Sequence, residues 1–243
     1  MQTISITTAI LLLTLVWVMN AQKSINWAGY QWYLRDDQNS GPGPNNWDSN
    51  NVWVDGNNKL HLRLRYSSTT GGWTCAELYT SINFSFGTFR WFIEGAIDQL
   101  DRNVVLGLFT YKGPDGTNEI DIEMAKWGRT EAEASNLFYT VYPHTLGIHD
   151  PVSSGTRISL QGTYTTHQFT WTPENVSFQS QHGFMTSPNT NTFFSYQTPT
   201  DFASSMPYTS TPLHINLWAF QGQPPTNGQP VEIIIHDFKY TKA

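Results

Sequence analysis

The sequence predicts an all-β sandwich. Helical periodicity is nearly absent, whereas apolar and polar side chains alternate with a period of two along many short segments, as they do on half-buried strands. In residues 60–65, three leucines alternate with His61, Arg63 and Arg65. Turn signals rich in Gly and Pro separate the segments. Many short strands without intervening helices favour two packed sheets.

The expected strands are spread along the chain from residue 60 onward. They are residues 60–65, Cys75–Thr80, Thr88–Glu94, Val104–Tyr111, Asn118–Met124, Leu137–Tyr142, His167–Thr172, Pro212–Trp218 and Val231–Tyr240. Only Thr130–Leu137 has a pattern that suits a turn or two of helix, and the polar stretch Thr186–Thr200 is expected to be a long loop. No repeat, linker or low-complexity tract divides the chain, so we expect a single domain over residues 22–243.

The first segment predicts export. Residues Ala9 to Met19 are apolar (AILLLTLVWVM), and Asn20, Ala21 and a polar continuation follow them. This run is too short to span a bilayer comfortably but suits the core of a secretory signal peptide. We therefore expect a signal peptide over residues 1–21, a secreted protein and no membrane partner.

The composition favours a polysaccharide partner. Charged residues make up 13% of the chain and aromatic residues 14%, including ten Trp. Exposed aromatic rings stack on the flat C–H faces of sugars. The net charge of −6 argues against nucleic acid, whose phosphates need clustered Lys or Arg. Cys75 is the only cysteine, which excludes an internal disulfide. Asn83 and Asn175 begin Asn-X-Ser sites that would accept glycans in a eukaryotic host.

The most informative segment is the acidic run Asn-Glu-Ile-Asp-Ile-Glu-Met at residues 118–124. On a strand, Glu119, Asp121 and Glu123 share one face, and the apolar residues between them share the other. Successive acids on one face lie about 6–7 Å apart and repel one another. A purely structural strand would gain from interleaved Lys or Thr, so the acids indicate a function.

Retaining hydrolysis of a glycosidic bond needs such a set of carboxyl groups. One carboxylate attacks the anomeric carbon, and a second, about 5–5.5 Å away, donates a proton and later activates water. Glu119 and Glu123 have Cα atoms roughly 13 Å apart on an extended strand, so their side chains must lean toward each other across Asp121. From the spacing alone, a calcium site and an acidic surface strand both stay open as alternatives.

The Glu-Ile-Asp-Ile-Glu run resembles the signature strand of glycoside hydrolase family 16, the group of laminarinases, lichenases and xyloglucan transferases. The resemblance implies a concanavalin A-like jelly roll of two curved antiparallel sheets with an open concave cleft. It implies Glu119 as the nucleophile, Glu123 as the acid/base and Asp121 as the assisting residue. It also implies an endo-acting enzyme on a β-linked polysaccharide, foremost a β-1,3(4)-glucan.

Further segments resemble this family in the same order along the chain. Cys75-Ala76-Glu77 is similar to a strand whose Glu binds a sugar on the non-reducing side of the cut, and His214-Ile215-Asn216-Leu217-Trp218 is similar to a cleft-lining Asn-Leu-Trp segment. The substrate-binding residues that we expect are Glu77, Phe109, Trp127, Tyr139, Asn216 and Trp218. For Trp127 and Tyr139, packing in the core is an equal alternative.

Departures from the family pattern leave the substrate open. Thr117 replaces a Trp before the signature, and Tyr79 replaces an Arg two residues after Glu77. Residues Ser177 to Gln181 replace a Trp-Tyr-Val-Asp-Gly hairpin, and the lichenase disulfide partner of Cys75 is missing. The linkage and the sugar therefore stay undetermined.

No cofactor is needed for this chemistry, and no His-Glu-x-x-His or similar metal spacing occurs. Asp237 lies where some relatives hold a structural calcium ion, so such an ion is an alternative expectation. We expect a monomer. Two other functions stay open: a transglycosylase on a cell-wall glucan, and a non-catalytic, lectin-like sugar-binding protein of the same fold.

Overall fold

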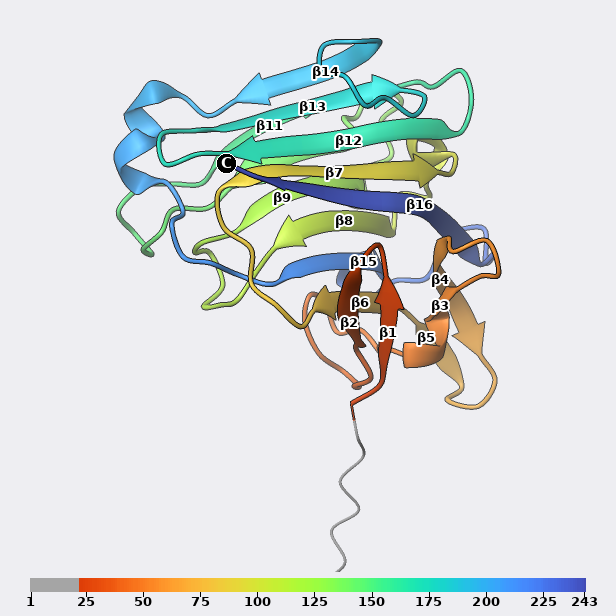
Figure 1. Ribbon diagram of the computed structural model, residues 1–243. Helices are drawn as coiled ribbons and strands as arrows, with labels where there is room; N and C mark the ends of the chain where they lie inside the picture. The colour runs from red at the N-terminus through yellow and green to blue at the C-terminus, as the bar shows by residue number, and fades with distance from the viewer. Residues whose placement is uncertain (1–21) are drawn as a thin grey trace, which may run out of the picture.

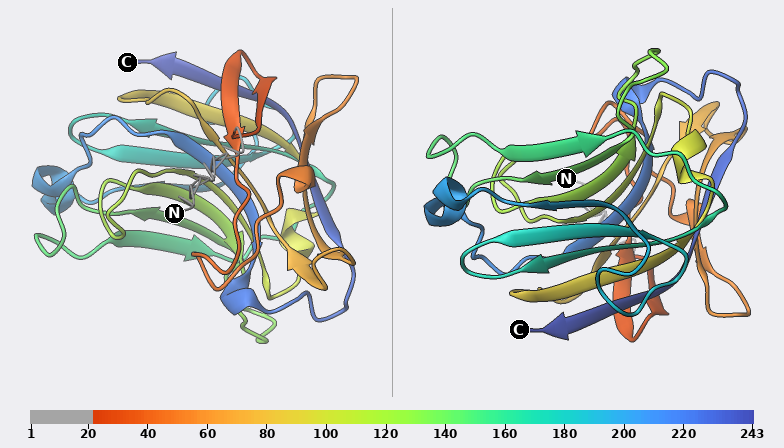
Figure 2. Two further views of the ribbon diagram at one scale, coloured as in Figure 1. Left: turned by 90° about the horizontal axis from the view of Figure 1, so that it is seen from below. Right: turned by 90° about the horizontal axis from the view of Figure 1, so that it is seen from above.

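The computed structural model describes residues 22–243. Their strands form two antiparallel sheets packed face to face in a jelly-roll sandwich, which the views from below and above in Figure 2 show as two layers. This confirms the fold predicted from the sequence. The expected signal peptide lies in residues 1–21, outside the described residues. Within residues 22–243, no helix has the length and apolar character needed to cross a membrane.

The strands of the described chain are divided between two sheets. In spatial order, sheet A consists of β1 (Ser24–Trp27), β2 (Tyr30–Leu34), β6 (Ala76–Thr80), β15 (Leu213–Ala219), β8 (Val104–Thr110), β9 (Ile120–Ala125), β10 (Leu137–Val141) and β11 (Val152–Thr156). Sheet B consists of β14 (Thr192–Gln197), β13 (Val176–His182), β12 (Tyr164–Trp171), β7 (Gly87–Glu94), β16 (Val231–Lys242), β4 (Leu60–Ser67) and β3 (Val52–Val54), and β5 (Gly72–Thr74) pairs with β4. Short 3-10 helices lie at Ser49–Asn51, Ile97–Gln99, Thr200–Ser205 and Phe220–Gly222. Figure 1 shows β12, β7 and β16 side by side in the sheet nearer the viewer, with β8 and β9 behind.

The core lies between the sheets, and the alternation of apolar side chains creates it. On β4 the three leucines are fully buried, whereas His61 and Arg63 face outward toward Glu232 of β16. On β9, Ile120 and Ile122 are fully buried. Burying such a side chain stabilises the fold by roughly 1.5–3 kcal/mol. Because the apolar side chains of β9 face the core, the acids of β9 face the other side of sheet A.

Two expectations about the elements are wrong. Thr130–Leu137 contains a turn and no helix, and Leu137 already begins β10. The polar stretch Thr186–Thr200 is not one long loop, because β14 lies inside it. The strands β1, β2, β3, β5, β11 and β13 have no counterpart among the expected strands.

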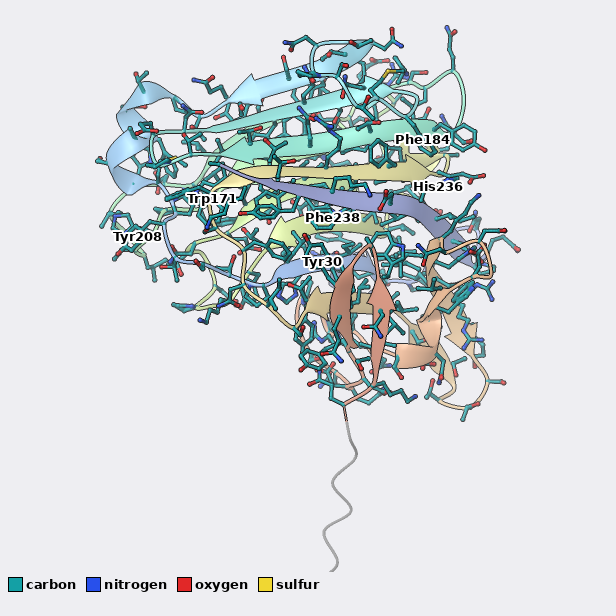
Figure 3. The ribbon with its side chains drawn as sticks, in the orientation of Figure 1. Tyr30, Trp171, Phe184, Tyr208, His236 and Phe238 are labelled. Atoms are coloured by element: carbon teal, nitrogen blue, oxygen red, sulfur yellow. The ribbon has the colours of Figure 1, made fainter. Side chains whose placement is uncertain are left out.

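The far face of sheet B carries a small aromatic group. Phe184, in the turn after β13, packs on Phe92 and His236 with ring centroids 5.7 Å and 4.7 Å apart. Figure 3 labels Phe184 and His236 at the same end of the sheet. Met185 N donates to Thr166 Oγ1 at 2.8 Å. These contacts hold the turn against the sheet.

Candidate active site

A cleft of about 1100 Å³ lies on the face of sheet A that points away from the core. Its lining extends from Arg35, just after β2, to Ser153 on β11. The strands from β6 to β11 are six neighbours, so with about 4.8 Å between strands the floor spans roughly 24 Å. A groove of this length is long enough for an extended segment of a polymer.

The first row of cleft residues crosses five strands. Glu77 on β6 lies opposite Asn216 on β15, which lies opposite Gly107 on β8. Gly107 in turn lies opposite Glu123 on β9, and Glu123 lies opposite Phe138 on β10. A Cβ atom at Gly107 would come within 2.5 Å of Asn216 Oδ1, so only glycine leaves room for this buried amide. The register therefore places Glu123 in line with two of the expected binding residues.

The second row runs beside the first. Tyr79 on β6 lies opposite His214 on β15, followed by Phe109 on β8, Asp121 on β9 and Thr140 on β10. The His214 ring is stacked between the other two rings, with centroids 5.2 Å from Tyr79 and 5.0 Å from Phe109. An aromatic wall thus leads along the floor to Asp121.

Glu119 stands just before β9 and is held by its neighbours. The Glu119 carbonyl accepts a hydrogen bond from Tyr142 N at 2.9 Å. Asn118, which has a left-handed φ of 51°, bonds through its side chain to His144 O at 2.9 Å. Asn tolerates this conformation better than most residues. These contacts fix the point at which the acidic strand begins, and all three acids line the cleft.

Burial and mutual repulsion raise the pKa of all three acids. Burial, followed by the charges of Glu123 and Asp115, raises the pKa of Glu119 above its usual range, while a hydrogen bond with Asp121 acts in the opposite direction. Burial, the charges of Glu119 and Glu123, and the same hydrogen bond raise the pKa of Asp121 well above its usual range. Burial raises the pKa of Glu123 to about 7. The shared hydrogen bond favours a proton on Asp121 and a negative charge on Glu119.

The raised pKa of Asp121 makes stability depend on pH. Below about pH 4, Asp121 is protonated in both the folded and the unfolded chain. Above this pH the unfolded chain loses the proton and the folded chain keeps it, so the free energy of unfolding falls by about 1.4 kcal/mol per pH unit until the folded-state pKa is reached. In Asp121→Asn the side-chain amide does not titrate, and its NH2 group can still donate a hydrogen bond to Glu119. We expect this variant to gain stability relative to the wild type as the pH rises, so that it is the more stable protein at pH 7 and the difference is much smaller at pH 4.

Urea denaturation at pH 4, 5.5 and 7 measures this effect. The matched control is Asp150→Asn, which removes an exposed carboxylate outside the cleft. Its stability relative to the wild type should stay constant over the three pH values. A constant difference for Asp121→Asn as well would show that Asp121 ionises normally in the folded protein.

Two tryptophans line the cleft beside Phe138. Trp127, in the turn after β9, packs on Trp218 of β15 and on Phe138, with ring centroids 6.1 Å and 6.3 Å apart. The guanidinium of Arg129 lies 5.1 Å from the centre of the Phe138 ring. Trp127 and Trp218 thus line the cleft while also packing against each other, and their binding of a substrate stays a prediction.

Tyr139 does not face the cleft, and the expectation that it binds substrate is wrong. Its ring is fully buried and stacks on Phe178 and Phe194, each with centroids 4.7 Å apart. Its hydroxyl bonds to Ser180 Oγ at 2.5 Å. On β10 the odd-numbered residues face the core, so Phe138 occupies the cleft instead.

Paired variants separate the two roles. Tyr139→Phe removes the bond to Ser180 and should lower the free energy of unfolding by about 1 kcal/mol without changing saccharide affinity. Phe138→Ala removes an aromatic surface from the cleft and should weaken saccharide binding roughly three- to tenfold. Urea denaturation and calorimetric titration with oligosaccharides measure both. Equal losses of affinity in the two variants would contradict this orientation of β10.

The cleft also contains residues that the sequence did not single out. Arg35 Nη1 donates to Glu77 Oε2 at 2.9 Å, and His214 Nδ1 lies 3.0 Å from Glu77 Oε1. Tyr111, which donates a hydrogen bond to Asp115, and Thr140 line the same cleft. The period-two pattern of Leu137–Val141 would have identified Phe138 and Thr140. No local signal connects Arg35 with a glutamate 42 residues away.

Within residues 22–243, no group of three or more His, Cys, Asp or Glu side chains is arranged to hold a metal ion. The Asp237 carboxylate lies 2.7 Å from Lys239 Nζ. The structural calcium ion therefore stays an expectation from the sequence.

Solved structures with a similar fold include β-glucanases. A Bacillus licheniformis β-glucanase superposes with a TM-score of 0.65 at 21% sequence identity, covering 92% of this chain and 100% of that chain. A family 16 endo-glucanase from Bacteroides ovatus superposes with a TM-score of 0.65 at 14% identity, covering 86% and 94%. This chain has the glycoside hydrolase family 16 fold.

Other comparisons limit what the family 16 fold implies. No protein-family model and no curated protein matches the sequence. A Mycobacterium tuberculosis protein described as an immunostimulatory antigen and pseudo β-1,3-glucanase has the same fold, with a TM-score of 0.64 at 17% identity over 87% of this chain and 91% of that chain. One fold can therefore serve different functions, and function must be argued from the site itself.

Proposed function

We propose that this chain is a secreted, retaining, endo-acting glycoside hydrolase that cuts a β-linked glucan, foremost a β-1,3(4)-glucan. The observation that carries the proposal is the set of three acids, Glu119 just before β9 and Asp121 and Glu123 on β9, in the floor of a cleft with aromatic walls. The names of the structural neighbours, which include endo-glucanases, support a glucan as the substrate. The apolar run at residues 9–19 supports export.

In the first step, Glu119 attacks the anomeric carbon while Glu123 donates its proton to the departing glycosidic oxygen. The bond between these two sugar atoms breaks, and an ester between the sugar and Glu119 forms. Asp121 holds its proton toward Glu119, which keeps Glu119 oriented and favours its charged form. Burial favours the protonated form of Glu123 that this step requires.

In the second step, Glu123 removes a proton from a water molecule, which attacks the anomeric carbon and releases Glu119. Two displacements restore the original configuration at this carbon. A cleft that crosses six strands of sheet A suits binding within a polymer rather than at its end. An acceptor sugar in place of water would give transglycosylation.

The deciding experiment is to measure reducing-sugar release by residues 22–243 on lichenan, laminarin, xyloglucan and agarose. Release from lichenan or laminarin, in fragments of several sugars, supports the proposal. Products longer than the substrate, formed when short oligosaccharides are added, would indicate the transglycosylase. Binding to a polymer without any cleavage would indicate the non-catalytic alternative.

A further inference from the structure

His214 is held by hydrogen bonds at both ring nitrogens. Nδ1 lies 3.0 Å from Glu77 Oε1, and Nε2 lies 3.1 Å from Tyr111 O. A backbone carbonyl and a carboxylate are both acceptors, so each nitrogen needs a proton to form its bond. A neutral imidazole has one N–H only, whereas an imidazolium donates from both nitrogens.

A neutral arrangement would require the proton to lie on Glu77 instead. Arg35 opposes this, because its Nη1 donates to the other oxygen of Glu77 at 2.9 Å, which favours the carboxylate. Arg35 also bonds to Asp37 through Nε at 3.2 Å, so it is one fixed cation shared by two carboxylates. A protonated His214 supplies a second positive charge, so that the two cations balance the two carboxylates.

The surroundings of the ring suit a cation. Tyr79 and Phe109 stack on its two faces with interplanar angles of 17° and 29°. Aromatic faces attract cations, more strongly where water is excluded. His214 is 9% exposed and Glu77 is 5% exposed. A carboxylate as buried as this one is costly unless it is paired and hydrogen-bonded.

The hydrogen bonds also fix the direction of the Glu77 carboxylate. Each of its oxygens accepts one bond, from Arg35 on one side and from His214 on the other. Each oxygen therefore keeps a free lone pair, and Glu77 lies in the same row of the cleft floor as Glu123. A sugar hydroxyl is a suitable donor for such a fixed acceptor.

We propose that His214 is a positioning residue: in its doubly protonated form it holds Glu77 in place and so determines how tightly a saccharide binds on the β6 side of the acids. The binding half of this inference rests on the proposed function. The protonation of His214 does not, so the two can be tested separately.

The first test is nitrogen-15 NMR of the histidine ring in the wild-type protein at pH 7, without any saccharide, with His214→Asn identifying the signal. We expect both nitrogens of His214 to carry protons and both protons to exchange slowly with water. A ring with one unprotonated nitrogen would overturn the inference, whatever the activity of the protein.

The second test is the effect of His214→Asn on the reaction and on binding. We expect KM and the Kd for a glucan oligosaccharide to rise about tenfold, and kcat to change less than threefold, because the three acids are untouched. His182→Asn, at an exposed histidine outside the cleft, should change none of these values. A loss confined to kcat, or an unchanged Kd, would overturn the inference.

Where His214→Asn fails to fold, His214→Gln takes its place. A wild type that binds and cuts no polysaccharide would refute the proposed function alone, and the NMR result would then decide whether His214 holds Glu77 as an imidazolium.

Discussion

Glu119→Ala should lower polymer hydrolysis on the order of 10³-fold or more, with little change in polymer affinity. The variant lacks the atom that attacks the anomeric carbon, and the losses seen for other catalytic groups set this scale. The fold should survive, because removing one of three mutually repelling carboxyl groups relieves strain. Reducing-sugar release on the active polymer measures the effect.

Added azide makes the assignment of Glu119 specific. Azide is small enough to occupy the space that the missing carboxylate leaves, and it should restore turnover of a glycoside with an activated leaving group. It attacks from the side of Glu119, so the product should be the α-glycosyl azide. The control is Glu133→Ala, which removes an exposed carboxylate paired with Arg157. Full polymer hydrolysis by Glu119→Ala would refute the mechanism.

Strands that bury apolar side chains could be predicted from the sequence, whereas a strand that buries polar side chains could not. On β4 and β9, inward residues are Leu, Ile or Met and outward ones are polar, so the alternation identifies both the strand and its faces. On β13 the core face includes Ser180, which bonds to Tyr139 and His167, and Gln179 and Gln181 are also buried. A strand that buries hydrogen-bonded polar groups shows no alternation of hydrophobicity, so β13 was missed.

The candidate site was predictable in its acids and less so around them. Three carboxyl groups at alternate positions of a strand repel one another, and this unfavourable arrangement indicates a function from the sequence alone. Tyr139 was expected in the cleft with a core role as an equal alternative, and the structure places it in the core together with Leu137 and Val141 of the same strand. The contact between Glu77 and His214 spans 137 residues and depends on the pairing of β6 with β15, which no local pattern encodes.

Glu123→Ala should behave differently from Glu119→Ala. Without its proton donor, the enzyme should lose about 10²–10⁴-fold in rate on a polymer, whose departing sugar is a poor leaving group. A glycoside with a dinitrophenyl leaving group needs no protonation, so formation of the ester with Glu119 should be nearly unaffected. Hydrolysis of the ester should then limit the rate, because no base activates water. Pre-steady-state release of dinitrophenol, seen as a burst, measures this.

Added azide also tests the assignment of Glu123, because the glycosyl azide that forms should have the opposite anomeric configuration. In Glu123→Ala the ester with Glu119 still forms, and azide enters from the side that Glu123 occupied. The product should be the β-glycosyl azide, the opposite of the product from Glu119→Ala. The same anomer from both variants would mean that the two residues do not act on opposite faces of the sugar. A β-glycosyl azide from Glu119→Ala and an α-glycosyl azide from Glu123→Ala would mean that Glu123 is the nucleophile and Glu119 the acid/base.

The pH profile follows from the same assignment. Catalysis needs a negative Glu119 together with protons on Asp121 and Glu123, so the three acids must carry one net negative charge. We assign the first ionisation of the three acids to Glu119 and the second to Glu123, whose pKa burial raises above its usual range. The wild-type rate on a polymer should therefore fall at high pH, when Glu123 loses its proton. At low pH the rate should fall because Glu119 becomes protonated. In Glu123→Ala, the rate of the burst on the dinitrophenyl glycoside should still decrease at low pH, where Glu119 becomes protonated. It should no longer decrease at high pH, because that decrease depends on the proton of Glu123.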